Sequence, residues 1–154
     1  MIKIMFVCHG NICRSPMAEF VLSDMLKKRG LDREVSVSSS ATSTEEIGND
    51  IHPGTRRILD KYSVPHTPRR AVELLRKDYE KYDLFVGMDS ANIRNMHRIF
   101  GADPDGKIIR LLDLTDEKRD VADPWYTGNF EATYRDVTLG CEALLKTIPI
   151  FVDK

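Results

Sequence analysis

Eight residues near the N-terminus restrict the possible folds of this chain more than any other stretch. Cys8 and Arg14 are separated by five residues, and Ser15 and Pro16 follow directly. An apolar run at residues 2–7 precedes the cysteine, and apolar residues recur at helical spacing after the proline. This order predicts a strand, a tight loop and a helix that begins with Ser15 as N-cap and Pro16 as its first residue. A tight loop before a helix N-terminus is a typical phosphate-binding arrangement.

The rest of the chain alternates between strand-like and helix-like patterns. Apolar or alternating runs predict three more strands, at residues 34–39, 83–88 and 106–110. Apolar residues at helical spacing predict helices at 53–62, 89–100 and 130–148, with a further short helix within 74–81. Polar stretches at 38–54 and 111–128 are expected to be loops.

Strands that alternate with helices form mainly parallel sheets that are covered on both faces. We therefore predict an α/β fold with three layers, αβα, around a central four-stranded parallel sheet, with the phosphate-binding loop after the first strand. Because a site in such a sheet lies at the carboxyl ends of the strands, the four loops that follow them are expected to meet at one edge. These loops begin at Cys8, Ser39, Asp89 and Leu111.

Length and charge limit the functional classes. A chain of 154 residues fits one domain over 1–154, and 23 basic against 24 acidic residues leave a net charge of -1. A general nucleic-acid or membrane-surface binder should be markedly basic, so neither partner is expected. The three cysteines do not suggest a disulfide framework, and the apolar N-terminal run is too short for a signal peptide or a membrane span. A cytoplasmic protein with free thiols is the expectation.

The pair Cys8 and Arg14 predicts nucleophilic chemistry on a phosphate. Inward backbone N–H groups, the positive end of the following helix and Arg14 would all favour the thiolate, which is the nucleophilic form of cysteine. The Ser15 hydroxyl is a further candidate donor to the sulfur. Arg14 can hold two phosphoryl oxygens through its planar fork. Alone, Cys8 would be interpreted as a small buried hydrophobe at a strand end, but its combination with Arg14 favours catalysis.

The residues between this pair are expected to surround the substrate. Their backbone N–H groups would cup the remaining phosphate oxygens, and Gly10 permits a turn that other residues resist. Asn11 is expected to brace the loop through bonds to the backbone or to Ser39. The expected substrate-binding residues in and beside the loop are His9, Gly10, Asn11, Ile12, Cys13 and Ser15.

Expulsion of an alkoxide or phenoxide from a phosphate ester requires a proton donor. Asp123 is the candidate general acid, because a proline stiffens the chain after it and two aromatic residues, Trp125 and Tyr126, follow. Such aromatics next to an acid suggest walls for a flat substrate ring. An Asp-Pro pair is also common in turns, and Trp125 could simply pack over the core. Two other carboxylates compete for the role, Asp113 and Asp120.

The other cysteines allow structural or chemical interpretations. Cys13 either packs inside the loop or forms a reversible disulfide with Cys8 upon oxidation. Cys141 lies on the apolar face of the predicted C-terminal helix, where a core role is expected. A zinc site built on Cys8 and Cys13 is disfavoured because no second Cys/His pair is nearby. We expect no metal and no cofactor.

The stretch from Val7 to Glu19, Val-Cys-His-Gly-Asn-Ile-Cys-Arg-Ser-Pro-Met-Ala-Glu, resembles the signature loop of the low-molecular-weight protein tyrosine phosphatases. The Asp-Pro-Trp-Tyr sequence that begins at Asp123 is similar to that family's general-acid loop. Residues 39–48 and 88–92 also match family stretches, so the resemblance extends in order over essentially the whole chain.

The resemblance implies a phosphotyrosine phosphatase that works in two steps. Cys8 would attack phosphorus while Asp123 protonates the leaving oxygen, and water would then hydrolyse the phosphocysteine with Asp123 as base. Arg14 would hold the phosphoryl group, and Asn11, Ser15 and Ser39 would support the loop. The implied partners are a phosphotyrosine protein or peptide and a tyrosine kinase that produces it. The implied protein acts as a monomer without metal or cofactor.

Two positions depart from the family pattern. Glu45 stands where the family often has an aromatic residue, so one wall of the substrate cleft would be acidic, which would suit peptides with basic flanks. His9 stands where the family often has an apolar or small residue, and it would tune the charge of the cleft with pH.

Three alternatives use the same scaffold or loop. Arsenate reductases resemble it but need a further cysteine pair in a later loop, whereas this chain has only Cys141 beyond the first motif. Protein-arginine phosphatases resemble a pattern with threonine at the position of Ile12, and an apolar residue there favours an aryl phosphate. A non-catalytic phosphate-binding module would predict loss of Cys8 or of the acid, and both are present.

Overall fold

The computed structural model describes the backbone of residues 1–152 and the side chains of residues 1–148. It contains four strands, β1 (Ile2–Cys8), β2 (Val35–Ala41), β3 (Leu84–Gly87) and β4 (Ile108–Arg110). Five α-helices are present, α1 (Arg14–Lys28), α2 (Pro53–Lys61), α3 (Ser90–Phe100), α4 (Pro124–Thr127) and α5 (Phe130–Val152). Two 3₁₀ helices complete the described elements, η1 (Arg76–Glu80) and η2 (Leu111–Leu114).

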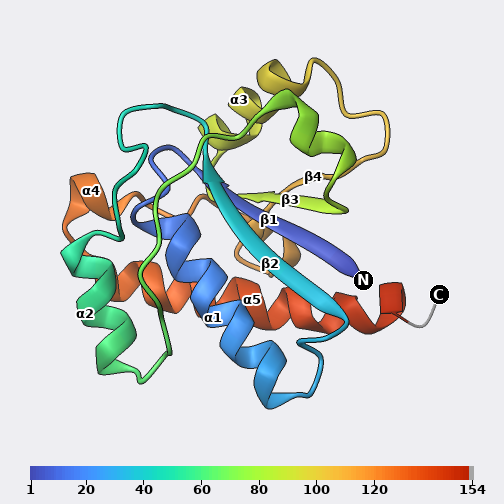
Figure 1. Ribbon diagram of the computed structural model, residues 1–154. Coiled ribbons are helices and arrows are strands. Elements are labelled where there is room, and N and C mark those ends of the chain that lie inside the picture. The colour runs from blue at the N-terminus through green and yellow to red at the C-terminus, as the bar shows by residue number, and fades with distance from the viewer. Residues whose placement is uncertain (153–154) are drawn as a thin grey trace.

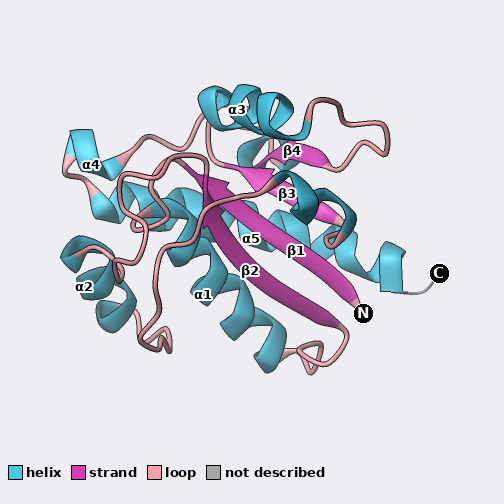
Figure 2. Cartoon of the chain, turned by 45° about the horizontal axis from the view of Figure 1, so that its top comes forward, coloured by secondary structure: helices cyan, strands magenta, loops and turns pink. Residues whose placement is uncertain are grey.

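The four strands form one parallel sheet in the order β2-β1-β3-β4. Helices α1 and α5 lie side by side on one face, and α3 lies on the other (Figure 1). The predicted three-layer αβα fold with a four-stranded parallel sheet is therefore confirmed. Figure 2 shows the loops that follow β1 and β2 reaching the same end of the sheet, near α4.

The central position of β1 explains why its residues from Ile4 to Cys8 are apolar without interruption. Its alternate residues face opposite layers: Ile4 and Phe6 pack with α1 and α5, whereas Met5 and Val7 pack toward α3 and η1. A parallel strand that is covered on both faces needs apolar residues at every position, unlike the alternation of a half-exposed strand. The buried run and β1 end together at Cys8, since the next residue, His9, is exposed.

Two expectations about local structure are wrong. The first helix begins at Arg14 instead of after Ser15, its N-cap is Cys13, and no side-chain hydrogen bond caps it. The Ser15 hydroxyl is unavailable as a cap because it bonds to Cys8 and Asn11. The stretch 111–128 is not simply a polar loop, since it contains η2 and α4, and η2 buries two leucines in the core.

Among the described residues, no helix combines the length and the apolar character that crossing a bilayer would require.

Candidate active site

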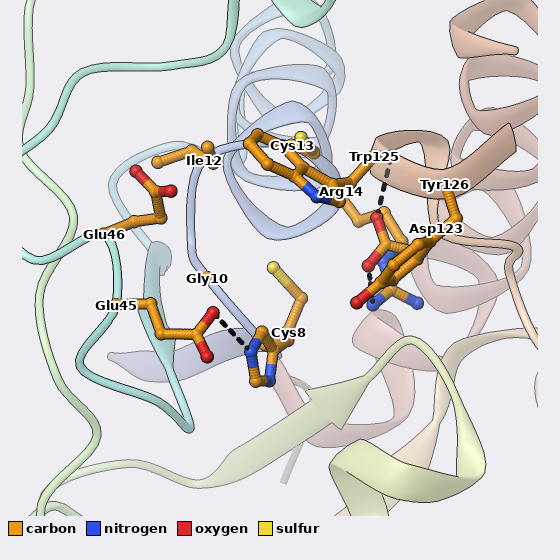
Figure 3. Close-up of a pocket in the computed structure, with 11 residues that line it drawn as sticks. Cys8, Gly10, Ile12, Cys13, Arg14, Glu45, Glu46, Asp123, Trp125 and Tyr126 are labelled. Carbon is orange, nitrogen blue, oxygen red and sulfur yellow. Dashed lines mark hydrogen bonds and ion pairs between the residues drawn. The ribbon is translucent and has the colours of Figure 1, made fainter. Parts of the chain in front are cut away.

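A pocket opens at the carboxyl end of β1, where three segments meet. These are the β1–α1 loop, the loop between β2 and α2, and the start of α4 (Figure 3). Three of the four loops expected at this edge of the sheet therefore line the pocket, and the fourth reaches it through Asp89, which bonds to Arg14. The pocket is lined by Cys8, His9, Gly10, Ile12, Cys13, Arg14, Glu45, Glu46, Asp123, Trp125 and Tyr126.

The sulfur of Cys8 receives hydrogen-bond donors from its own loop. The backbone N–H of Asn11 donates to Sγ at 3.3 Å, and the Ser15 hydroxyl lies 3.0 Å from the same sulfur. Because the Ser15 oxygen already accepts a bond of 2.7 Å from Asn11 Nδ2, its own hydrogen is free to point at the sulfur. Two hydrogen-bond donors thus point at the sulfur that is the candidate nucleophile.

Asn11 holds the loop in shape from beneath. Its backbone φ of 59° lies in the left-handed region, which asparagine tolerates better than most residues. Its Nδ2 donates to Ser39 Oγ at 2.9 Å as well as to Ser15, and its Oδ1 accepts from Arg69 Nη2 at 2.6 Å and from the Val72 N–H at 3.2 Å. Both ends of the amide are thus satisfied in a fully buried position.

The side chains of Asn11 and Ser15, two residues expected to bind substrate, lie beneath the loop and outside the pocket. Asn11 and Ser15 have no exposed surface and do not line the pocket. Their polar atoms are occupied by Ser39, Arg69 and the sulfur of Cys8. The side chains of Asn11 and Ser15 therefore brace the loop from below and do not line the pocket.

Arg14 enters the pocket from the first turn of α1 with its side chain almost fully buried. Nη1 donates to Asp89 Oδ2 at 2.7 Å and to the Val121 carbonyl at 2.9 Å, and Nη2 lies 3.4 Å from Asp123 Oδ2. Burial opposes its charge, but Cys8, Asp89 and Asp123 together raise the pKa of Arg14 above its ordinary value. The guanidinium is therefore a fixed, permanent positive charge beside Cys8.

Asp123 has one oxygen engaged with the backbone and one facing the pocket. It is the N-cap of α4, where Oδ1 accepts the N–H of Trp125 at 3.0 Å. Its Oδ2 is directed toward Arg14. This fixes the carboxyl group on the wall opposite the loop between β2 and α2 (Figure 3). The Asp-Pro pair therefore begins a short helix and also aims a carboxyl group into the pocket.

The two competing acids lie elsewhere. Asp113 and Asp120 both pair with Arg110, at 2.8 and 2.9 Å, and neither lines the pocket. Partial burial opposes ionisation of Asp120, but hydrogen bonds from Arg110 and Ser90 hold its pKa below the usual range. Because a general acid must reach the leaving group and Asp123 is the one of the three that lines the pocket, the geometry favours Asp123.

The aromatic pair after Pro124 is exposed rather than packed in the core. Trp125 is 56% exposed and Tyr126 is 82% exposed. Both line the pocket on the same side as Asp123 (Figure 3). The edge of the Trp125 ring contacts His52, with ring centroids 5.8 Å apart. The alternative that Trp125 simply covers the core is therefore wrong, and a wall suited to a flat ring is present.

The opposite side of the mouth is acidic, as the sequence predicted at Glu45. Glu45 Oε2 lies 3.1 Å from His9 Nε2, so the two residues that depart from the family pattern contact each other. Sequence reasoning missed Glu46, which also lines the pocket and accepts a bond of 2.6 Å from Asn49 Nδ2. Its position beside Glu45 in a loop was the available signal.

Three supporting residues were also missed. Asp89 orients Arg14, Arg69 bonds to Asn11, and Glu19 accepts a short bond of 2.5 Å from Ser39. Asp89 could have been found, because it follows a buried strand at the active edge of the sheet. No signal in the sequence marked Arg69, whose role depends on how the segment after α2 crosses the sheet edge.

The remaining thiols behave differently from Cys8. All three cysteines are free. Burial, with a smaller effect of nearby Cys8, raises the pKa of Cys13 to about 12, so Cys13 is a neutral thiol in the pocket wall. Cys141 is fully buried in α5, as expected for a core residue. Within the part of the chain that the structure describes, no group of three metal-ligating side chains occurs.

Known proteins match this chain along nearly its whole length. The family described as low molecular weight phosphotyrosine protein phosphatase matches residues 3–150. The Bacillus subtilis protein named low molecular weight protein-tyrosine-phosphatase YfkJ is 38% identical over 150 residues, which cover 96% of each chain. The crystal structure of YfkJ superposes with a TM-score of 0.94 and covers 97% of this chain and 95% of its own.

A second solved structure supports the same assignment. The low molecular weight protein tyrosine phosphatase SP-PTP from Streptococcus pyogenes is 38% identical and superposes with a TM-score of 0.85, covering 95% of this chain and 92% of its own. The resemblance inferred from the Cys8 and Asp123 motifs is thereby confirmed. With matched sequence, matched fold and a thiol beside a buried guanidinium at the sheet edge, the chain belongs to the low molecular weight phosphotyrosine protein phosphatase family.

Proposed function

We propose that this chain hydrolyses phosphotyrosine in proteins or peptides through a covalent phosphocysteine intermediate. The observation that carries the proposal is the convergence of Cys8, Arg14 and Asp123 on one pocket. They supply a nucleophile, a fixed positive charge and a proton donor. Hydrolysis of a phosphate monoester through a covalent intermediate requires these three functions.

In the first step the Cys8 thiolate attacks phosphorus in line with the tyrosine oxygen. A sulfur–phosphorus bond forms as the phosphorus–oxygen bond breaks, and Asp123 transfers its proton to the departing phenolate. Arg14 and the backbone N–H groups of the loop hold the phosphoryl oxygens, whose charge is spread over the equatorial positions. The incoming phosphate would lie beside Arg14, whose Nη2 is 3.4 Å from Asp123 Oδ2, so the charge that holds the phosphate and the acid are adjacent.

In the second step a water molecule attacks the phosphocysteine. Asp123, now ionised, accepts a proton from the water as the new phosphorus–oxygen bond forms. The sulfur–phosphorus bond breaks, which releases inorganic phosphate and regenerates the Cys8 thiolate. The donors from Asn11 and Ser15 then stabilise sulfur as the leaving group, for the same reason that they favour the nucleophile.

An aryl ester is the substrate that the walls of the pocket favour. Trp125 and Tyr126 present exposed ring surface beside Asp123, and Ile12 adds an apolar side chain across the phosphate loop. A phenyl ring gains from both contacts, whereas the charged guanidino group of phosphoarginine gains little from Ile12. The names of the relatives, which describe them as tyrosine phosphatases, agree with this preference.

The proposal also covers the domain organisation, oligomeric state, substrates and location of the enzyme. We infer that residues 1–154 act as one catalytic domain, as a monomer, on proteins modified by a tyrosine kinase. A cytoplasmic location fits a pocket that depends on a reduced Cys8, and all three cysteines are free.

Substitution of the proposed acid tests the mechanism. Asp123→Asn should lower kcat on phosphotyrosine about 10²–10⁴-fold, because the phenolate then leaves without a proton. The loss should be much smaller with para-nitrophenyl phosphate, whose leaving group needs little protonation. Steady-state kinetics with both substrates measure the difference. Asp120→Asn is the matched control, because Asp120 pairs with Arg110 outside the pocket.

Two outcomes would contradict this assignment. Retention of hydrolysis by Cys8→Ser would exclude the thiolate as nucleophile. A larger loss of kcat in Asp120→Asn than in Asp123→Asn would assign the general acid to Asp120. A wild-type protein that binds phosphate but cleaves no aryl phosphate would favour the phosphate-binding module. Faster cleavage of phosphoarginine than of phosphotyrosine peptides would favour the arginine phosphatase.

A further inference from the structure

The mouth of the pocket has two chemically different sides. On one side lie the aromatic rings of Trp125 and Tyr126 with the carboxyl group of Asp123 (Figure 3). On the other side lie Glu45 and Glu46, which together we call the acidic wall. The acidic wall faces the phosphate loop from the segment between β2 and α2, so it borders any group that extends past the phosphate.

Backbone hydrogen bonds hold the segment that carries the acidic wall at both of its ends. Before it, the N–H groups of Thr42 and Ser43 donate to the carbonyls of Cys8 and His9, each at 3.0 Å. After it, the N–H of Gly48 donates to the Ala71 carbonyl at 2.9 Å. The segment is therefore held against the phosphate loop and need not be ordered when a substrate binds.

Each carboxylate of the wall also has a neighbour that limits its movement. Glu45 contacts His9, and Glu46 accepts a hydrogen bond from Asn49. The stem of Glu46 lies over the phosphate loop, since a Cβ placed on Gly10 would be 3.4 Å from its Cγ. Both negative charges are thus kept at the mouth, close to where a phosphate would enter.

This arrangement is unfavourable for a small phosphate ester on its own. Glu45 and Glu46 place two carboxylates at the mouth, in addition to Asp123, which carries the proton in the proposed first step, and the guanidinium of Arg14 is itself paired with Asp89. A doubly charged phosphate is repelled by acids at the mouth. His9 can offset the charge of Glu45 only when it is protonated. A positive charge carried by the substrate would remove the repulsion and add attraction.

We propose that the acidic wall makes this enzyme selective for phosphotyrosine that has lysine or arginine next to it in the peptide. The inference rests on the proposed function, because it assigns a sequence preference to the same site. With the tyrosine ring against Trp125 and Tyr126, the peptide crosses the mouth toward Glu45 and Glu46, where a flanking cation meets two carboxylates. Glu45 and Glu46 are then specificity-determining residues.

Kinetics with matched substrates test the proposal through effects of opposite sign. The substrates are a phosphotyrosine peptide with lysine on both sides, the same peptide with glutamine on both sides, and para-nitrophenyl phosphate. Wild type should prefer the lysine peptide over the glutamine peptide in kcat/KM by about three- to tenfold, as expected for partly exposed ion pairs. The preference should shrink at high ionic strength, where such pairs are screened.

The double variant Glu45→Gln/Glu46→Gln should abolish that preference. It should also increase kcat/KM for para-nitrophenyl phosphate, because removing two negative charges lessens repulsion of the phosphate. Glutamine keeps the size of each side chain and its ability to bond to His9 and Asn49. Glu34→Gln/Glu80→Gln is the charge-matched control, since both residues are exposed outside the pocket, and it should behave as wild type.

The outcomes separate this inference from the proposed function. Cleavage of all three substrates with equal preference in wild type and double variant would overturn the acidic wall and leave the phosphatase proposal intact. Failure to cleave any of them would overturn the proposed function first. A preference for the glutamine peptide in wild type would show that the wall repels phosphate without recruiting a cation, and would also overturn the inference.

Discussion

At the scale of single residues, the phosphate loop depends on Asn11 more than on any capping residue. The left-handed backbone of Asn11 is unfavourable for most side chains, and it persists here because four hydrogen bonds surround the amide. Two of those partners were foreseeable, Ser15 as a polar residue at a helix start and Ser39 as one at a strand end. Arg69 lies 58 positions further along the chain, so its contribution depends on tertiary structure.

The two cysteines of the loop should differ in reactivity across the pH range. With a pKa of about 12, Cys13 is protonated at pH 7, and its thiolate fraction rises as the pH approaches that value. Iodoacetamide at pH 7 should therefore alkylate wild type once, at Cys8. The folded Cys8→Ser variant should remain unlabelled, because burial is the main cause of the raised pKa of Cys13. Intact-protein mass spectrometry measures the label.

The control for this experiment is Cys13→Ser, which should still be labelled at Cys8. Labelling of folded Cys8→Ser at the wild-type rate would show that Cys13 is ionised near neutral pH. The same protonation bears on the possible Cys8–Cys13 disulfide: oxidation should begin at Cys8, with Cys13 as the thiol that resolves it.

At the scale of elements, glycines decide how closely the helices approach. Gly54 in α2 lies under the ring of Phe130, where a Cβ would come within 2.5 Å of the ring carbons. Gly140 in α5 lies against Leu111 of η2, and a Cβ there would overlap the leucine side chain. In the sequence, a glycine inside a helical pattern indicates only that the helix is less stable there. The structure shows that it allows η2 to pack on α5 and so fixes the start of the segment that leads to Asp123.

Gly140→Ala should therefore destabilise the protein. Alanine is better than glycine in a helix by roughly 0.5–1 kcal/mol, but overpacking of a core contact typically costs about 1–3 kcal/mol, so the clash should dominate. Urea unfolding of wild type and variant measures the change. In the double variant Gly140→Ala/Leu111→Ala the new methyl group partly fills the space left by the leucine. The loss in free energy of unfolding in the double variant should therefore be smaller than the sum of the losses in the two single variants. Strict additivity, or a more stable Gly140→Ala, would contradict this contact.

At the scale of the whole molecule, the parallel sheet brings the parts of the site together. The nucleophile is the last residue of β1, the acidic wall follows β2, Asp89 follows β3, and Asp123 follows β4 and η2. The segment before Asp123 is tied to α5 by Arg119, which donates to both carboxylate oxygens of Asp136 at 2.9 Å. The site therefore joins segments from almost the full length of the chain, and its occupancy should be linked to global stability.

Inorganic phosphate, the proposed product, should stabilise the folded protein. At about 100 times its Kd, a ligand that binds only the folded state adds about 2.7 kcal/mol to the free energy of unfolding. Thermal unfolding in phosphate, compared with chloride at equal ionic strength, measures the effect. Cys8→Ser should keep the stabilisation, whereas Arg14→Lys should lose most of it, because an ammonium group cannot hold two phosphate oxygens at once. Equal stabilisation of Arg14→Lys and wild type would show that phosphate binds elsewhere.

Much of the fold was predictable because local sequence patterns, such as apolar runs and helical periodicity, determine its strands and helices. The apolar run of β1, the helical stripe of α5 and the alternation between them led to the parallel αβα sheet. The start of α1 was predicted wrongly, since the rule that serine caps helices ignores a hydroxyl already bound to a sulfur and an amide. The helices η2 and α4 were missed because short segments carry little periodicity.

The sequence by itself determined which chemical groups are available and roughly where along the sheet they emerge. Cys8, Arg14 and Asp123 could be singled out because the loop motif and the Asp-Pro-aromatic motif are local, and the spacing of strands and helices dictates a common edge. Only the tertiary structure decided which carboxylate meets the pocket and which meets Arg110, that Asp89 and Arg69 brace the loop, and that Glu46 joins Glu45 at the mouth. Those outcomes depend on distances between segments far apart in sequence, which local propensity does not encode.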